Sequence, residues 1–225
     1  MPATRRAMIG GALDLSLYPL AYAGGEAPEV NVGLMPCLVI SYEQGMAWKA
    51  KDIGHERDAL LDKRGVKIVT WIWQDGGVMS RTHGVVGPDD TKGLKIRGDS
   101  REMDLMLKQV GGIISSITSE ETYAGMQTGS LDAAVTSSTS LISFRLQEIA
   151  KNVTSARTGS FWFMFEPLLM SKIVFDSLTP EQQAADMDAD AIAQWRAVSQ
   201  ASAWKDFAGR SASCAAMLKL AEAVA

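Results

Sequence analysis

Arg97 is the side chain whose type and position most clearly suggest chemistry. It ends the short segment Leu94–Arg97, which lies between glycines and which we expect to form a strand. Ligands bind at the carboxyl ends of strands in open α/β sheets, and a guanidinium there can hold a carboxylate through two parallel hydrogen bonds. The alternative is that Arg97 pairs with a nearby acid, Asp99 or Asp132, and only stabilises the sheet edge. The strand position alone supports both interpretations equally.

A run of hydroxyl residues is a second candidate for binding. It follows the predicted strand Leu131–Val135, begins a helix, and consists of Thr136, Ser137, Ser138, Thr139 and Ser140. Helix-terminal N–H groups and side-chain hydroxyls can both donate hydrogen bonds to an anion. One residue is enough to cap a helix, so the length of the run favours a binding surface over capping alone.

Common catalytic signatures are absent from the sequence. It has no Gly-x-Gly-x-x-Gly, no phosphate loop, no His-Glu-x-x-His and no Gly-x-Ser-x-Gly. His55 lies in a charged helical stretch and His83 in a glycine-flanked loop, and we interpret them as a solvated residue and a turn residue. We therefore expect that the chain is not an enzyme.

Composition restricts the class of partner. The 225 residues are 47% hydrophobic and 21% charged, with a net charge of −4 and no basic stripe, so we expect a globular protein that binds no nucleic acid. Residues 5–23 imitate a secretory signal, but Asp14 interrupts the apolar part, and Pro19 with the glycines that follow indicates a strand and a turn. No segment has the roughly 18 uninterrupted apolar residues of a membrane span.

Strand and helix patterns alternate along the chain. We expect a helix from Ser41 to Gly65 and a buried strand Val66–Trp73 after it. Later strands are expected at residues 94–97, 113–117 and 131–135, each followed by a helix. The alternation favours parallel strands covered by helices on both faces, which is the doubly wound α/β arrangement.

Capping signals mark the starts of the expected helices. Ser100 begins one helix, and Thr118 with Glu121 forms a capping box for the next. The helix after the hydroxyl run is expected to carry Ile142, Leu146 and Ile149 on one face, and two more helices are expected around Trp195 and Cys214. The chain thus ends in helices alone.

Several motifs occur in the order found in one transporter family. They are Gly93–Arg97, Glu121 with Tyr123, Gln127–Asp132 and Ser143–Glu148, with Lys63–Lys67 upstream and Glu166–Lys172 downstream. The sequence resembles the DctP-like substrate-binding proteins of tripartite ATP-independent periplasmic (TRAP) transporters, and the resemblance covers nearly the whole chain. The family's carboxylate-binding arginine falls on Arg97.

This resemblance implies an α/β, two-lobed periplasmic-binding-protein-like fold that closes over an organic acid. The family's first strand, first helix and signal peptide would precede Met1, so we expect a chain shortened at its N-terminus, with no clear signal peptide of its own. Residues 1–76 and 163–185 would form the rest of the first lobe, residues 77–162 the second lobe, and residues 186–225 C-terminal helices.

The resemblance also implies the site and the partners. Trp73, Trp162 and the hydroxyls of Thr136, Ser137 and Ser138 are expected to shape the pocket. Gln74 and Glu166 match positions that hold a bridging cation in 2-oxoacid binders, for which sodium or calcium would suit oxygen ligands. The alternative for Glu166 is a buried acid paired to Arg97.

The implied function is capture of a small oxo-, hydroxy- or aromatic acid in the periplasm, for the membrane permease subunits of a TRAP transporter. Two alternatives stay open from the sequence. One is an α/β enzyme that acts on carboxylates with Glu166 or His83 as base, and the other is a truncated relative with little binding. The sequence does not indicate an oligomeric state.

Overall fold

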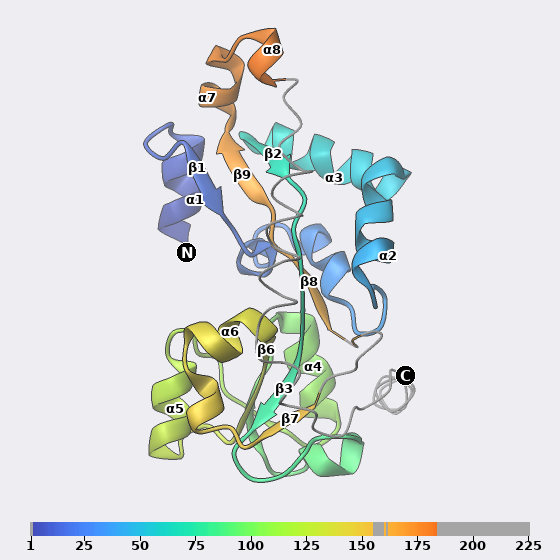
Figure 1. Ribbon diagram of the computed structural model, residues 1–225, viewed down its shortest axis with the longest axis vertical. Coiled ribbons are helices and arrows are strands. Elements are labelled where there is room, and N and C mark those ends of the chain that lie inside the picture. Colours follow the sequence, from blue (N-terminus) through green and yellow to red (C-terminus); the bar gives the residue numbers. More distant parts are fainter. Residues whose placement is uncertain (1, 155–159, 161, 184–225) are drawn as a thin grey trace. The chain divides into compact units, whose positions relative to one another are not determined.

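The computed structural model describes residues 2–154, 160 and 162–183 (Figure 1). The helices expected around Trp195 and Cys214 lie outside these residues. The chain divides into two compact units, one containing the residues up to Val30, Tyr42–Trp73 and the described residues from Phe165 to Gln183, and the other containing Asn31–Ser41 and Gln74–Met164. The lobe boundaries expected from the sequence stay a prediction.

Unit 1 is built on a three-stranded antiparallel sheet in the order β1-β9-β2, formed by Leu15–Leu17, Leu168–Ser171 and Val66–Thr70. Leu169 of the central strand is buried and lies opposite Ser16 on one side and Ile68 on the other. Helices α1 (Pro2–Ile9), α3 (Asp52–Lys63) and α7 (Lys172–Ser177) pack against these strands (Figure 1). The strand expected before Pro19 and the pair Gly24-Gly25 is therefore present as β1.

The helices of unit 1 are short. They are α1 (Pro2–Ile9), the 3₁₀ helix η1 (Leu20–Ala23), α2 (Tyr42–Ala47), the 3₁₀ helix η3 (Trp48–Ala50), α3 (Asp52–Lys63), α7 (Lys172–Ser177) and α8 (Pro180–Gln183). The 3₁₀ helix η2 (Pro28–Leu34) leads from unit 1 into unit 2. No helix among the described residues is long and apolar enough to cross a membrane.

The single helix expected from Ser41 to Gly65 is wrong, because the chain is extended at Lys51. A Cβ on Gly54 would lie under 3.0 Å from the carbonyl oxygen of Trp48, so the start of α3 folds back closely on the preceding turn. The predicted end is confirmed, since Gly65 has a φ of +82°.

The expected strand Val66–Trp73 is also divided. β2 ends at Thr70 and β3 begins at Trp73, with the buried residues Trp71 and Ile72 between them. Apart from Lys67 and Thr70, the segment is apolar on both sides of the break, so its composition gave no sign of where β2 ends.

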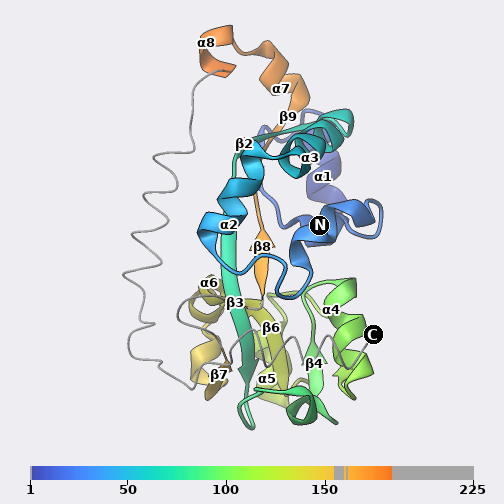
Figure 2. The ribbon, with the colours of Figure 1, turned by 90° about the vertical axis from the view of Figure 1, so that its right-hand side faces the viewer.

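Unit 2 contains a six-stranded mixed sheet in the order β5-β4-β6-β3-β7, with β8 paired to β3. Its strands are β3 (Trp73–Ser80), β4 (Lys95–Arg97), β5 (Ile113–Ile114), β6 (Ala133–Ser137), β7 (Asn152–Thr154) and β8 (Phe163–Phe165). Figure 2 shows β4, β6 and β3 side by side.

The expectation of parallel strands holds for only part of this sheet. β4 runs parallel to β5 and to β6, whereas β3 runs antiparallel to β6 and β7. Helices connect the parallel strands in sequence, as such crossovers require: α4 (Arg101–Gln109) lies between β4 and β5, and α5 (Thr122–Thr128) between β5 and β6. The chain reaches β4 from β3 through a loop with the 3₁₀ helix η4 (Pro88–Thr91), which carries no such crossover helix.

The predicted cap at Ser100 is confirmed, whereas the capping box of Thr118 and Glu121 is present only in part. Ser100 Oγ accepts a hydrogen bond from Met103 N at 3.2 Å, and Glu121 Oε2 accepts one from Thr118 N at 2.8 Å. Gly129 ends α5 with a φ of +78°. α5 begins only at Thr122, with Glu121 as the N-cap residue and no side-chain cap, so Thr118 precedes the helix rather than caps it.

The helix expected to carry Ile142, Leu146 and Ile149 is wrong beyond its first turns. α6 ends at Ser143, Arg145 has a φ of +56°, and a short 3₁₀ helix, η5 (Leu146–Glu148), follows. Leu146 still packs into the core of unit 2. Leu146 is apolar because it is buried, so the apolar residues keep a helical spacing although the α-helix itself has ended.

Candidate functional site

Arg97 lies at the end of β4 and is fully buried, with 2% of its surface exposed. Its Nε donates to Ile117 O at 3.0 Å, and its Nη1 donates to Val135 O at 3.1 Å. Its Nη2 donates to Asp99 Oδ1 at 3.0 Å and to Ser119 Oγ at 3.1 Å. Hydrogen bonds to four different residues thus fix the position of the guanidinium.

The pair with Asp99 is the alternative that the sequence left open for Arg97. Burial raises the pKa of the Asp99 carboxyl, although the charge and the hydrogen bond of Arg97 act to lower it. Asp99 Oδ2 is buried and has no hydrogen-bond partner within the described part of the chain. Asp132, the other acid considered, instead accepts a hydrogen bond from Lys95 N at 3.0 Å. Arg97 therefore has one buried counter-charge.

Arg97 and the hydroxyl run lie at the same edge of the sheet. β4 and β6 are parallel neighbours, with Arg97 opposite Ala134, so their carboxyl ends point the same way. The Nη1 bond to Val135 O joins the two strands directly before the hydroxyl run begins. The sheet thus brings the two candidate groups of the sequence together.

The hydroxyl run forms a connected network. Ser137 caps α6 (Ser138–Ser143) by accepting from Ser140 N at 3.1 Å, and its Oγ also lies 2.8 Å from Thr139 Oγ1. Ser138 Oγ donates to Asp75 Oδ1 at 2.5 Å, and Thr139 Oγ1 donates to Gln74 Oε1 at 2.5 Å. Capping accounts for one hydroxyl, and others fasten α6 to β3.

Trp162 is placed next to this network by a glycine. A Cβ on Gly76 would lie under 3.0 Å from the Trp162 ring and from Thr136 O, so only a glycine fits here. Ser160 Oγ also donates to Gly76 O at 2.5 Å. Within unit 2, the structure therefore brings together Arg97, Gln74, Thr136, Ser137, Ser138 and Trp162.

Trp73 belongs to an aromatic cluster in unit 1. Its ring centroid lies 5.5 Å from that of Trp48 and 5.1 Å from that of Phe165. A Cβ on Gly45 would lie 2.8 Å from the Trp73 ring, so this glycine of α2 makes room for the indole. Trp71 completes the cluster, with its centroid 4.6 Å from that of Phe165.

Arg57 of α3 lies among these four rings. Its Cζ is 4.6 Å from the Phe165 centroid, 5.4 Å from that of Trp48, and 5.9 Å from those of Trp71 and Trp73. Burial lowers the pKa of Arg57 to about 10, so the group stays charged at neutral pH. Neither Nη1 nor Nη2 has a hydrogen-bond partner among the described residues.

Glu166 follows the last ring of this cluster along the chain. Its backbone N–H donates to Ile72 O at 2.9 Å. Across the described ranges, no group of three or more His, Cys, Asp or Glu side chains is arranged to hold a metal. Gln74 Oε1 accepts a hydrogen bond from Thr139 Oγ1 at 2.5 Å.

His83 is bonded as the sequence interpretation expected of a turn residue. Its Nε2 lies 2.8 Å from Asp90 O and its Nδ1 3.1 Å from Thr82 Oγ1. Both ring nitrogens are engaged within the loop. This arrangement does not favour the alternative in which His83 acts as a base.

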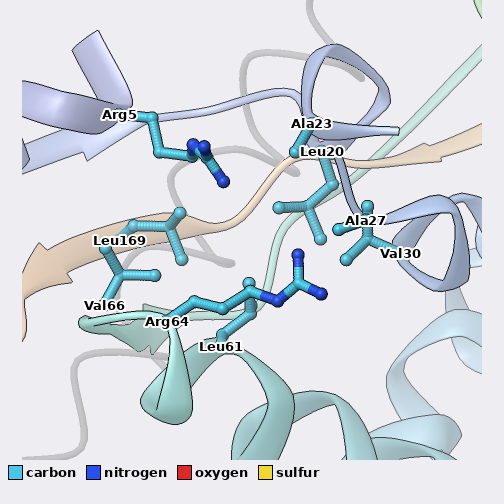
Figure 3. A pocket seen from close by; sticks show the side chains of 9 residues that line it. All are labelled: Arg5, Leu20, Ala23, Ala27, Val30, Leu61, Arg64, Val66 and Leu169. Carbon is cyan, nitrogen blue, oxygen red and sulfur yellow. The ribbon is translucent and has the colours of Figure 1, made fainter. Parts of the chain in front are cut away.

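A small pocket in unit 1 lies apart from the predicted residues. It holds about 20 Å³, roughly enough for one water molecule, and is lined mainly by apolar side chains such as Leu20 and Val30. Figure 3 shows Arg5 and Arg64 reaching toward it from different elements. Arg5 pairs with Glu26, and Arg64 with Glu29 at 2.6 Å. This pocket is too small for an organic acid.

Sequence reasoning missed Arg57, Asp75 and Ser119. Arg57 shares the buried face of α3 with Gly54 and Leu61, at spacings of three and four residues. That spacing was a usable signal, because it places a charged residue where an apolar one is expected. The contacts of Asp75 and Ser119 come from distant segments and had no signal of this kind.

The sequence matches bacterial extracellular solute-binding protein family 7 over residues 3–207. A solute-binding protein of Albidiferax ferrireducens is 46% identical, over 94% of this chain and 73% of that protein. The 2,3-diketo-L-gulonate-binding periplasmic protein YiaO of Escherichia coli is 28% identical, over 78% of this chain and 53% of that protein.

Solved structures agree with this match. A TRAP periplasmic solute-binding protein from Rhodoferax ferrireducens with bound malonate superposes with a TM-score of 0.86 at 48% identity. The superposition covers 97% of this chain and 72% of that one. The chain therefore belongs to family 7 of the bacterial extracellular solute-binding proteins, in which the DctP-like proteins of TRAP transporters are found.

Proposed function

We propose that this chain captures a small organic carboxylate in the periplasm and delivers it to the membrane permease subunits of a TRAP transporter. The observation that carries the proposal is its similarity, over 97% of its length, to a TRAP binding protein with bound malonate. Members of the family bind solutes for transport and do not convert them. The enzyme alternative is therefore set aside.

Arg97 is the proposed anchor for the acid group. A guanidinium has five N–H donors, and the four hydrogen bonds of Arg97 leave one N–H on Nη1. A carboxylate oxygen bound there would form a charge-assisted hydrogen bond. Thr136, Ser137 and Ser138 would contribute polar groups from the same sheet edge.

The other predicted residues keep their proposed roles in the site. Trp162 and Gln74 lie beside the hydroxyl network of unit 2, and Trp73 and Glu166 lie in unit 1. The Trp162 Nε1 and Trp73 Nε1 donors are buried without a hydrogen-bond partner among the described residues. Each indole therefore has an N–H available for an oxygen of a solute.

Titration of the purified chain with small acids tests the proposed function. We expect isothermal titration calorimetry to detect binding of at least one of malonate, 2-oxoglutarate, lactate, D-glucuronate and benzoate, with dissociation constants of about 1 μM or tighter. The corresponding amides, which lack the negative charge, should bind at least about tenfold more weakly. The proposal would be contradicted if acids and amides bound equally tightly, or if none of the acids bound.

The cation at Gln74 and Glu166 stays a prediction, and it has its own measurement. If sodium or calcium bridges to the solute, replacing sodium with choline or adding EDTA should weaken binding of a 2-oxoacid by about tenfold or more. Gln74→Leu should remove that dependence, while Gln44→Leu, on the exposed surface of α2, should leave it unchanged. Affinity that is the same in all three buffers would exclude the ion.

A further inference from the structure

We propose that Arg57 binds a carboxylate group of the solute, with the Trp73 indole N–H as a second donor. The proposal deepens the proposed function and rests on it, because it assigns an anion-binding group to unit 1. Arg57 matches none of the family motifs found in the sequence. Its assignment comes from the contacts of α3 with the aromatic cluster.

The argument begins with hydrogen-bond donors that lack acceptors. Arg57 is 4% exposed, and its Nη1 and Nη2 are both buried without a partner in the part of the chain that the structure describes. The Nε1 of Trp73 is also buried without a partner among the described residues, and the centroid of its ring lies 5.9 Å from Arg57 Cζ. All these groups donate, so the group that would satisfy them is an acceptor, and a negatively charged one is favoured most.

Charge supports the same conclusion. Arg97 has Asp99 as a buried counter-charge. Arg57 is surrounded by aromatic rings instead, and the charge of Asp58 acts on it only through space. Aromatic faces attract a guanidinium, but they do not replace the strong acceptors that its N–H groups lose on burial. Arg57 therefore carries a positive charge that an anion can neutralise.

The aromatic rings also define which anion fits. Arg57 Cζ lies over the rings of Trp48, Trp71, Trp73 and Phe165, so aromatic faces surround the guanidinium. The two terminal nitrogens form a planar fork that matches the two oxygens of a carboxylate. A planar carboxylate is thus the class of group that this site would take.

A purely structural role for Arg57 makes the opposite prediction for stability. If the guanidinium served only to hold the rings together, its removal would destabilise the free protein. If it is held there for an anion, replacing an unpaired buried charge with an apolar side chain should leave the free protein equally or more stable. The two roles therefore differ in two measurable quantities.

The experiment uses the full chain and titrates it with malonate and with D-glucuronate. Arg57→Met should weaken binding of the acid that the wild type binds by about a hundredfold, and Arg57→Lys by about tenfold, because lysine keeps the charge but loses the fork. Trp73→Phe should weaken it by about threefold to tenfold. Arg64→Met is the matched control: it removes a half-buried arginine of the same unit, paired with Glu29, and should bind as the wild type does.

Thermal unfolding of the free proteins provides the second readout. We expect the midpoint of Arg57→Met to equal or exceed that of the wild type, and malonate to raise the wild-type midpoint more than the variant's. Unchanged affinity in both Arg57→Met and Arg57→Lys would overturn the inference and leave the proposed function intact. A wild-type chain that binds no acid would overturn both. If Arg57→Met does not fold, the affinity of Arg57→Lys for the acid tests the inference by itself.

Discussion

Arg97→Met is expected to lower the free energy of unfolding by about 3 to 5 kcal/mol, because it leaves Asp99 buried without its counter-charge. The same change removes donors from Ile117 O, Val135 O and Ser119 Oγ. Urea denaturation followed by circular dichroism would measure the loss. The double variant Arg97→Met/Asp99→Asn should recover most of it, since it contains no unpaired charge.

The pH dependence of this loss follows from Asp99. Burial raises the pKa of its carboxyl above the value in the unfolded chain, so the folded state binds the proton more tightly. Removing Arg97 takes away the groups that lower this pKa. The stability deficit of Arg97→Met should therefore shrink as the pH falls from 7 through the raised pKa of Asp99. A deficit that stays constant at every pH at which both proteins fold would contradict the buried ion pair.

The same residue is expected to control affinity. Arg97→Lys keeps the charge, but its three N–H donors cannot make the four contacts within the protein and also bind an acid, so carboxylate binding should weaken by about tenfold or more. Arg145→Lys, at an exposed arginine that pairs with Glu148 in the same unit, is the control and should bind normally. An Arg97→Lys protein with wild-type affinity would exclude Arg97 as the anchor.

Gly76→Ala is expected to destabilise unit 2 by about 3 kcal/mol. The added methyl would lie under 3.0 Å from a backbone oxygen of β6 and from the Trp162 ring. The backbone oxygen belongs to the neighbouring strand and cannot move away cheaply, so β3 and β6 must separate or Trp162 must shift.

Denaturation midpoints of Gly76→Ala and Gly84→Ala would test this close approach. Gly84 lies in the loop after β3, where the nearest atom to an added Cβ is 3.9 Å away, so its replacement should change stability by less than about 0.5 kcal/mol. Equal midpoints for the two variants would show that β3 and β6 are less tightly packed than described.

Local signals in the sequence predicted local structure well. Ser100 begins a helix as expected, Thr118 and Glu121 are bonded in the turn before one, and Gly65 and Gly129 follow helices with positive φ. Each depends on contacts within a few residues, which residue types alone determine. The division of one expected helix at Lys51 was not predicted, because the close approach of Gly54 to the carbonyl oxygen of Trp48 has no signal in the residue types.

The site was predictable where it followed from strand order. Parallel neighbours place their carboxyl ends together, so the proximity of Arg97 to the hydroxyl run required only that β4 and β6 be adjacent. The antiparallel strand β3 was not predicted, because its glycines Gly76 and Gly77 indicated a loop after Trp73. Arg57 was missed because its aromatic neighbours come from segments separated along the chain.

The four hydrogen bonds of Arg97 have a further thermodynamic effect. An arginine side chain carries about 2 kcal/mol of rotamer entropy, and in this protein that freedom is lost during folding, before any solute arrives. Binding an acid then immobilises the solute but not the anchor. Differences in affinity between acids should therefore reflect the flexibility and hydration of the acids themselves more than any reorganisation of the arginine that receives them.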